Sequence, residues 1–183
     1  LLQSPFTLHK FLLEQIDREA KAAALGKPAR IIAKMNALTE KRVIRALYEA
    51  SQAGVTIDLI IRGACCLRPG IPGVSENIKV RSVVGRFLEH TRLFFFENGS
   101  DAQVYAASAD WMDRNLLQRV ETCFPIQDTK LAKRAIQEGL MVYLSDNTGA
   151  WLMDDVGNYT HHRPSRRAKP RAAQTELLRL LAN

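Results

Sequence analysis

Apolar residues recur along the chain with two spacings, and each spacing predicts one kind of element. Residues 5–26, 40–54 and 128–136 carry apolar side chains at helical spacing, which predicts helices. Shorter apolar or alternating runs predict strands. These runs are residues 30–35, 55–61, 79–84, 91–96, 104–107, 118–124 and 151–153. One chain therefore carries both patterns, as in an α/β protein.

The residues between these runs predict how the elements connect. The Ser-Pro pair at residues 4–5 is typical of a helix start, since serine caps a helix and proline fits its first position. The Asn-Gly pair at residues 98–99 predicts a hairpin turn, and residues 64–77, with two prolines, predict a surface loop. The strand, helix and strand within residues 30–61 predict a right-handed crossover between parallel strands. We therefore expect a mostly parallel central sheet flanked by helices.

The composition indicates a single compact domain with a polyanionic partner. With 183 residues, 46% of them hydrophobic, the chain can bury one sizeable core. A formal charge of +7 and a pI near 9.6 favour nucleic acid, an acidic membrane surface or a phosphate polymer as the partner. We expect a domain at residues 1–160 and a basic tail at residues 161–183, packed on the domain or extending from it. The tail is either a solvated extension or a contact surface for polyphosphate or nucleic acid.

The cysteines and the hydropathy pattern indicate the compartment. Cys65 and Cys66 are adjacent and Cys123 is distant in sequence, so the chain has neither a disulfide framework nor the usual zinc spacing. No run approaches the roughly 18 apolar residues of a membrane span. We expect a soluble, cytoplasmic protein. Because the chain begins at Leu1, within a predicted helix start, we also expect it to be a piece of a longer polypeptide.

Several common phosphate and metal motifs are absent. The sequence has no Walker loop, no dinucleotide-type glycine fingerprint and no His-Glu-x-x-His helix. The acidic pair at residues 154–155 and the histidine pair at residues 161–162 make no natural chelate, because neighbours on an extended chain point in opposite directions. We therefore predict no metal ligands in this chain, and phosphate must be bound in another way.

His90 and Arg92 are the first candidates for that role. In a strand, alternation would place both side chains on one face, about 7 Å apart. Imidazole can act as nucleophile, acid or base near neutral pH, and guanidinium offers forked donors to phosphate oxygens. An ordinary structural or surface histidine is the alternative interpretation of a single His-x-Arg.

Polar residues at the ends of predicted strands extend this candidate site. Ligands bind to open α/β sheets at the carboxyl ends of the strands. Arg62 stands at such an end, and Lys34 and Asn36 end the preceding strand in the same way. A further polar segment follows the predicted strand at residues 104–107. It contributes Ser108, Asp110, Arg114 and Asn115.

Several of these segments resemble bacterial polyphosphate kinase of the long, histidine-phosphorylating type. The matching runs are Ile-Arg-Gly at 61–63, Gly-Arg-Phe-Leu-Glu-His at 85–90, Phe-Glu-Asn-Gly at 96–99 and Ser-Ala-Asp-Trp-Met-x-Arg-Asn at 108–115. The regions at residues 34–38 and around Gln174 agree in order and spacing. The resemblance covers essentially the whole chain, and the run at 108–115 is highly specific.

The resemblance implies a phospholipase D-like sandwich in which residues 1–160 form half of a shared active site. His90-x-Arg92, followed after four residues by Glu97, looks like a degenerate form of that superfamily's His-x-Lys-x4-Asp motif. The resemblance also implies reversible transfer of the terminal phosphate of ATP to polyphosphate through a phosphohistidine, with magnesium present. That histidine belongs to a preceding domain, which would also bind most of the ATP and Mg²⁺. His90 would be the second histidine of the site, and Arg62 an arginine that contacts ATP.

The expected protein is therefore a transferase domain that is inactive by itself. Its expected partners are ATP or ADP, polyphosphate, and the preceding domains of the same polypeptide, in a full-length protein that we expect to be a homo-oligomer and that could associate with a membrane. Nucleic acid is not expected. Two alternatives stay open on the residues alone: a phospholipase D-like phosphodiesterase or nuclease that pairs two copies of His90, and a basic module that binds nucleic acid.

Overall fold

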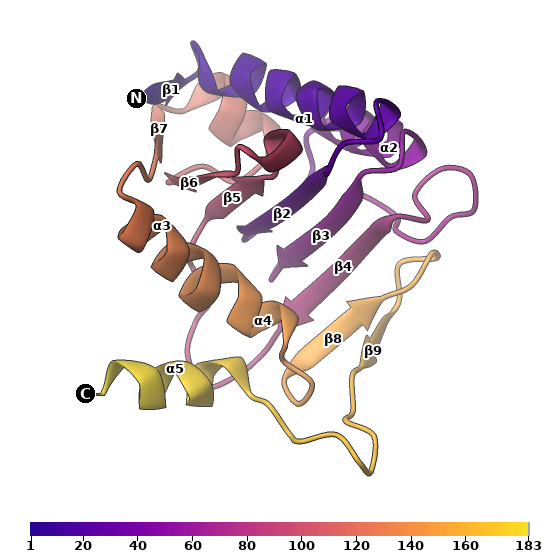
Figure 1. Ribbon diagram of the computed structural model, residues 1–183, viewed down its shortest axis with the longest axis vertical. Helices are drawn as coiled ribbons and strands as arrows, with labels where there is room; N and C mark the ends of the chain where they lie inside the picture. The colour runs from indigo at the N-terminus through magenta and orange to yellow at the C-terminus, as the bar shows by residue number, and fades with distance from the viewer. Residues whose placement is uncertain (183) are drawn as a thin grey trace.

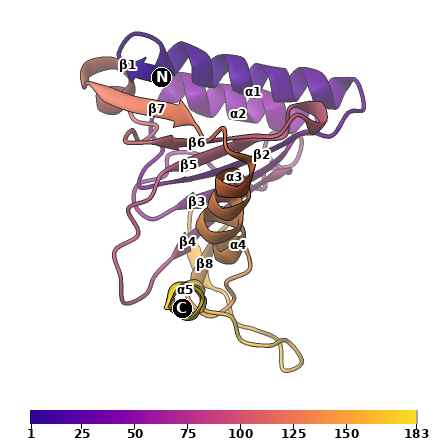
Figure 2. The ribbon, with the colours of Figure 1, turned by 60° about the vertical axis from the view of Figure 1, so that its left-hand side comes forward.

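The computed structural model describes residues 1–182, so Asn183, the last residue of the predicted tail, lies outside the described residues. The chain forms one nine-stranded sheet covered by helices on both faces (Figures 1 and 2). The strands are β1 (Leu2–Ser4), β2 (Arg30–Met35), β3 (Thr56–Ile61), β4 (Ile78–Val83), β5 (Leu93–Phe96), β6 (Gln103–Ala107), β7 (Glu121–Pro125), β8 (Ala150–Met153) and β9 (Tyr159–His161). The helices are α1 (Leu8–Ala24), α2 (Lys41–Gln52), α3 (Thr129–Ile136), α4 (Val142–Leu144) and α5 (Ala173–Leu181). Shorter helical turns are η1 (Asn98–Ser100), η2 (Arg114–Gln118) and η3 (Gln137–Met141).

The α/β class is confirmed, but the expectation of a mostly parallel sheet is wrong. The strand order is β1-β7-β6-β5-β2-β3-β4-β8-β9, and only the β2–β3 and β3–β4 pairs are parallel. Short connections explain the difference, because a hairpin turn can only join antiparallel strands. The predicted turn at residues 98–99 joins β5 to β6 in this way. The predicted parallel crossover between β2 and β3 is confirmed, and α2 makes it.

Two apolar cores lie on opposite faces of the sheet, because alternate strand residues point to opposite sides. Helices α1 and α2 pack on one face over Ile31, Ala33 and Met35. Helices α3, α4 and α5 pack on the other face, where Ile32 is buried. Figure 2 shows these two helical layers on either side of the strands. The side chain of Lys34 follows Ile32 in the alternation and therefore lies on the face covered by α3 to α5.

Three predicted element starts are wrong. Helix α1 begins at Leu8 rather than after Ser4, which pairs with β7 as part of β1. Strand β7 begins at Glu121, because the residues before it form the η2 turn. Strand β5 begins at Leu93, so His90 and Arg92 lie in the preceding loop rather than on one strand face. The carbonyl of Arg92 still accepts from the N–H of Ala107 at the end of β6, whereas the backbone of Phe87 and the carbonyl of His90 have side-chain partners.

The segments that follow β2, β3 and β6 meet at one edge of the sheet. Leu38, just after β2, forms isolated parallel bridges with both Cys65 and Trp111. The backbone N–H groups of Thr39 and Glu40 donate to the carbonyl of Trp111. The residues that end β2 are therefore held between the segments that follow β3 and β6, and this junction forms the floor of the candidate site.

Candidate phosphate-binding site

A polar cleft of about 400 Å³ opens over this junction. Its walls come from the ends of β2 and β3, the loop before β5 and the segment between β6 and β7. The lining side chains with chemistry are Asn36, Arg62, His90, Arg92, Ser108, Asp110, Arg114, Asn115, Arg119 and Glu121. Every residue predicted for the site except Lys34 lines this cleft, so the folded chain brings these residues together at one edge of the sheet.

Asp110 is the buried centre of the cleft, with a relative exposure of 6%. Its Oδ1 accepts hydrogen bonds from the backbone N–H of Asn36 at 2.7 Å and from Arg92 Nε at 3.0 Å. Its Oδ2 accepts from Arg92 Nη2 at 3.2 Å. The side-chain amide of Asn36 also donates to this carboxylate. A single carboxylate therefore fixes both the end of β2 and the guanidinium of Arg92, with a forked geometry that suits an Arg–carboxylate pair.

Arg62 is held through the same centre by way of Asn36. Because the amide nitrogen of Asn36 faces Asp110, its Oδ1 faces the opposite way and accepts from Arg62 Nε at 2.8 Å. Gly63 N donates to the Asn36 carbonyl at 2.7 Å, and a Cβ at Gly63 would lie only 2.9 Å from that oxygen. Glycine is therefore needed for this close approach. Within residues 1–182, only the Nε of the Arg62 guanidinium has a protein partner, so its terminal N–H groups are available to a ligand.

His90 is exposed at the mouth of the cleft, beside Arg92. Arg92 Nη1 lies 3.5 Å from His90 Nδ1 and donates to the His90 carbonyl at 3.1 Å. The His-x-Arg pair was predicted on a strand, and the structure places it in a loop instead. The two side chains still meet, because Arg92 bridges from Asp110 back to His90.

Ser108 and Asn115 line the cleft but are engaged by a carboxylate that sequence reasoning missed. Ser108 Oγ donates to Glu121, and Asn115 Nδ2 donates to Glu121 Oε1 at 2.7 Å. Arg119 was also missed. Both missed residues follow the η2 turn, which brings the start of β7 back to the cleft, and no spacing in the sequence indicates that reversal.

Lys34 lies outside the cleft, in the core on the face of the sheet that α3 to α5 cover. It is 2% exposed, and its Nζ forms an ion pair with Glu89 Oε2 at 2.9 Å. The ammonium also lies 4.4 Å from the centre of the Tyr143 ring. Burial lowers the pKa of Lys34 below its usual 10.5, against the opposing effect of Glu89. The inclusion of Lys34 in a row of cleft donors was therefore wrong, because its position in β2 directs it away from that edge.

The residues of the cleft do not fit a divalent cation. Mg²⁺ prefers carboxylates and water in an octahedral shell. Asp110 and Glu121 are the carboxylates that line the cleft, and both accept hydrogen bonds from protein donors. Across the described part of the chain, no three His, Cys, Asp or Glu side chains gather as metal ligands would.

The fold defines an α/β domain of the phospholipase D-like kind, with a cleft lined by arginines at one edge of its sheet. The phospholipase D family member Nuc from Salmonella typhimurium superimposes with a TM-score of 0.54 at 16% identity, covering 74% of this chain and 87% of that one. At this identity the likeness concerns the fold alone, so it gives no support to the phosphodiesterase alternative.

Residues 1–174 match the family model described as polyphosphate kinase C-terminal domain 2, and the chain therefore belongs to the polyphosphate kinase family. It is 59% identical to the polyphosphate kinase of Pseudomonas aeruginosa and 57% identical to that of Pseudomonas putida, over 100% of this chain in both cases. The crystal structure of polyphosphate kinase from Porphyromonas gingivalis superimposes with a TM-score of 0.94 at 40% identity, covering 99% of this chain and 28% of that one. The chain spans about a quarter of the length of these relatives, and the family resemblance expected from its motifs is confirmed.

None of the helices in residues 1–182 combines the length and the apolar character that a bilayer crossing requires.

Proposed function

We propose that this domain supplies one wall of the active site at which a polyphosphate kinase transfers the terminal phosphate of ATP to inorganic polyphosphate, and back. The observation that carries the proposal is the gathering of four arginines and His90 around one polar cleft. Forked guanidinium donors match phosphate oxygens in both geometry and charge. The preceding domains of the same polypeptide would supply the facing wall.

The arginines would act on the charge of the transferred phosphoryl group. Phosphoryl transfer passes through a loose transition state, and most of its catalysis is positioning and charge stabilisation. Arg62 and Arg92 are already fixed by Asn36 and Asp110, so they need little reorganisation when charge develops. His90, next to Arg92, would donate a proton or hydrogen bond to an oxygen of the transferring phosphate.

The covalent step would take place on the preceding domain. A histidine nitrogen there attacks the γ-phosphorus of ATP, the bond between the γ-phosphorus and its bridging oxygen breaks, and ADP leaves. A terminal oxygen of polyphosphate then attacks the same phosphorus, and the N–P bond breaks. This chain would hold the phosphoryl oxygens in both steps. Since Asp110 and Glu121, the carboxylates that line the cleft, accept hydrogen bonds from protein donors, the magnesium that the family implies would be bound by the other domains.

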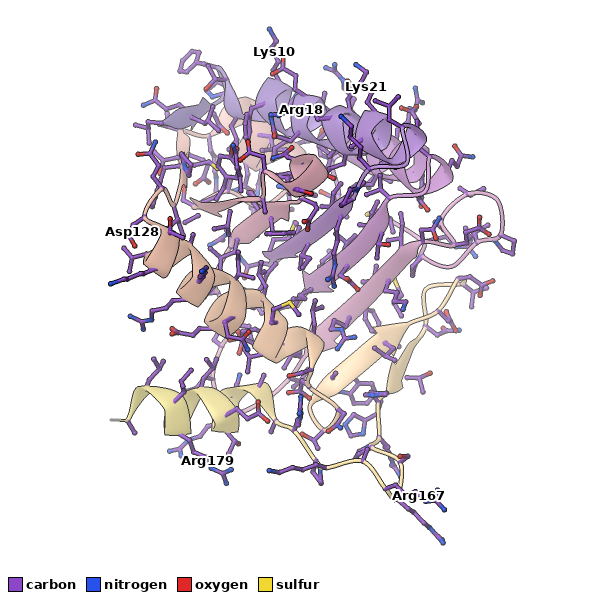
Figure 3. The ribbon with its side chains drawn as sticks, in the orientation of Figure 1. Lys10, Arg18, Lys21, Asp128, Arg167 and Arg179 are labelled. Carbon is purple, nitrogen blue, oxygen red and sulfur yellow. The ribbon has the colours of Figure 1, made fainter. Side chains whose placement is uncertain are left out.

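Substitutions in the full-length protein test this assignment. Arg62→Ala and His90→Ala are each expected to lower kcat for ATP-dependent polyphosphate synthesis by about 10²-fold or more, since each removes a preorganised group from the charge that develops. Arg18→Ala is the matched control, because Arg18 is exposed on α1 (Figure 3) and does not line the cleft. Synthesis at the control rate by either variant would contradict the assigned role.

The chain by itself is expected to bind phosphate polymers without catalysing polyphosphate synthesis. It contains the arginine wall but not the domain that carries the nucleophilic histidine of the proposal. Robust polyphosphate synthesis from ATP by the purified 183-residue chain would show that this division of the site is wrong.

A further inference from the structure

The loop that carries His90 is exposed, yet it is anchored at defined points. Residues 84–88 are all exposed, and His90 is exposed as well. Between them, the side chain of Glu89 turns inward, and it is 10% exposed. The contacts of the Glu89 side chain therefore determine how this exposed loop is held beside His90.

Gln174, in the first turn of α5, binds the loop from outside. Its Oε1 accepts from Phe87 N at 2.9 Å, and its Nε2 donates to the Phe87 carbonyl at 2.8 Å. The same Nε2 donates to Glu89 Oε1 at 2.7 Å. A Cβ added at Gly85 would overlap Gln174 Oε1, so glycine at residue 85 leaves room for this side chain in its hydrogen-bonded position.

Lys34 binds the same carboxylate from inside the core. Its ammonium lies 2.9 Å from Glu89 Oε2, and both side chains are at least nine-tenths buried. Both oxygens of Glu89 are therefore engaged, one by β2 and the other by α5. Burial raises the pKa of Glu89, but Lys34 and Gln174 outweigh it and hold the pKa below 4.5.

The start of helix α5, which carries Gln174, is itself fixed. The backbone N–H of Ala173 donates to Oδ2 of the buried Asp146 at 2.7 Å. Oδ1 of Asp146 accepts from the N–H groups of residues 148–150, so this carboxylate joins α5 to the start of β8. Gln174 therefore reaches the loop from a fixed helix start.

We propose that Lys34, Glu89 and Gln174 form a clamp of positioning residues that places His90 in the cleft. His90 lies between two fixed points: Glu89, immediately before it, and Arg92, which holds the His90 carbonyl. The clamp does not touch the reacting groups and acts through the backbone of the loop. The proposal rests on the function proposed above for His90 and assigns to α5 a role in that function.

The test uses the full-length protein with Gln174→Met, which keeps the length of the side chain and removes its three hydrogen bonds to the loop. We expect kcat for polyphosphate synthesis to fall about 10-fold or more, since small displacements of a positioned group are costly. The KM for ATP should change less than about threefold, because the arginines keep their own partners. Gln52→Met is the matched control, since Gln52 also donates to a loop carbonyl, that of Gly73, away from the cleft.

Hydrogen–deuterium exchange of the peptide containing residues 84–92 tests the clamp independently of activity. Gln174→Met and Glu89→Gln are both expected to accelerate exchange there, and Gln52→Met is not. Unchanged exchange in this peptide, with kcat at the wild-type value in both clamp variants, would overturn the clamp.

A double variant separates positioning from a general loss of structure. If Gln174 acts through His90, adding Gln174→Met to His90→Ala should lower kcat no further than about twofold. A further tenfold loss would show that Gln174 acts by another route. If His90→Ala alone leaves kcat unchanged, the proposed role of His90 fails, whereas the exchange experiment still decides whether the clamp holds the loop.

Discussion

Replacing Asp110 by asparagine should disconnect the arginines of the cleft while preserving its shape. The carboxylate receives the backbone and side-chain N–H groups of Asn36 and two N–H groups of Arg92. In Asp110→Asn one acceptor oxygen becomes an NH₂ group, which must face one of these donors. The variant therefore loses the ion pair with Arg92 and places two donors against each other.

The size of the effect follows from burial and solvent access. The side chains of Arg92 and Asp110 are 12% and 9% exposed. Removing one partner of a fully buried pair costs about 3–5 kcal/mol. Because the cleft opens to solvent, Arg92 can regain water, and we expect a loss of about 2–3 kcal/mol in the free energy of unfolding. Chemical denaturation of the chain, followed by circular dichroism, measures this loss.

Asp128→Asn is the matched control for this experiment. Asp128 caps α3 at the surface (Figure 3), accepting from the N–H groups of Lys130 and Leu131. Asparagine caps a helix about as well as aspartate, so the control should change stability by less than about 0.5 kcal/mol. In the full-length protein, Asp110→Asn should also lower kcat by about 10²-fold or more, since Arg92 loses its partner and Arg62 depends on Asn36. A stability change no larger than that of the control would refute the central role of Asp110.

Three further predictions concern the surroundings of the cleft. Replacing the five cations of residues 163–171 by glutamine should weaken polyphosphate binding, because these side chains are exposed and Arg167 projects away from the body of the domain (Figure 3). The slope of log K against log salt concentration should become shallower by roughly one unit for each phosphate that is no longer neutralised. If duplex DNA competes more tightly than polyphosphate, the tail is instead a nucleic-acid surface. The pKa of Glu89 in the folded chain lies below 4.5, so the ionised carboxylate contributes to stability above that pH and loses this contribution as the pH falls through its folded pKa. The free energy of unfolding of Glu89→Gln should therefore fall less steeply in acid than that of the unmodified chain. Gly85→Ala should reproduce the loop exchange and kcat of Gln174→Met, because the added methyl group occupies the place of Gln174 Oε1.

Local patterns in the sequence predicted most of the elements but little of their arrangement, and β1, β9 and α5 were not predicted. The strand, helix and strand of residues 30–61 were predicted correctly because each pattern, and the crossover rule that joins them, depends on neighbouring residues. The share of parallel strands was not predicted correctly, since the antiparallel pairs of β5 with β2 and of β8 with β4 depend on packing between distant segments. The helix start predicted at Ser4 failed because pairing with β7 outweighed a favourable local cap.

The candidate site shows the same division. Arg62 and Asn36 could be predicted to lie together because carboxyl ends of adjacent parallel strands must share an edge of the sheet. Lys34 was misplaced because a strand end does not reveal which face an alternating side chain occupies. The region around Gln174 matched the family, but its contact with Glu89 joins residues 85 positions apart, which only the folded chain brings together.

The carboxylates around the cleft explain how a cationic site can be rigid without repelling an anion. Asp110 orients Arg92 and Asn36, and Glu121 orients Ser108 and Asn115, so each acidic group directs its charge toward donors of the protein. The donors are then held in place before a ligand arrives, while the terminal N–H groups of Arg62 have no hydrogen-bond partner within residues 1–182. The Lys34–Glu89 pair lies below the loop and adds no net charge, so it can fix the backbone before His90 without competing for phosphate. The carboxylates thus orient the site, and the arginines would bind the ligand. Loss of an orienting contact, as in Gln174→Met, should therefore lower kcat with little change in the KM for ATP.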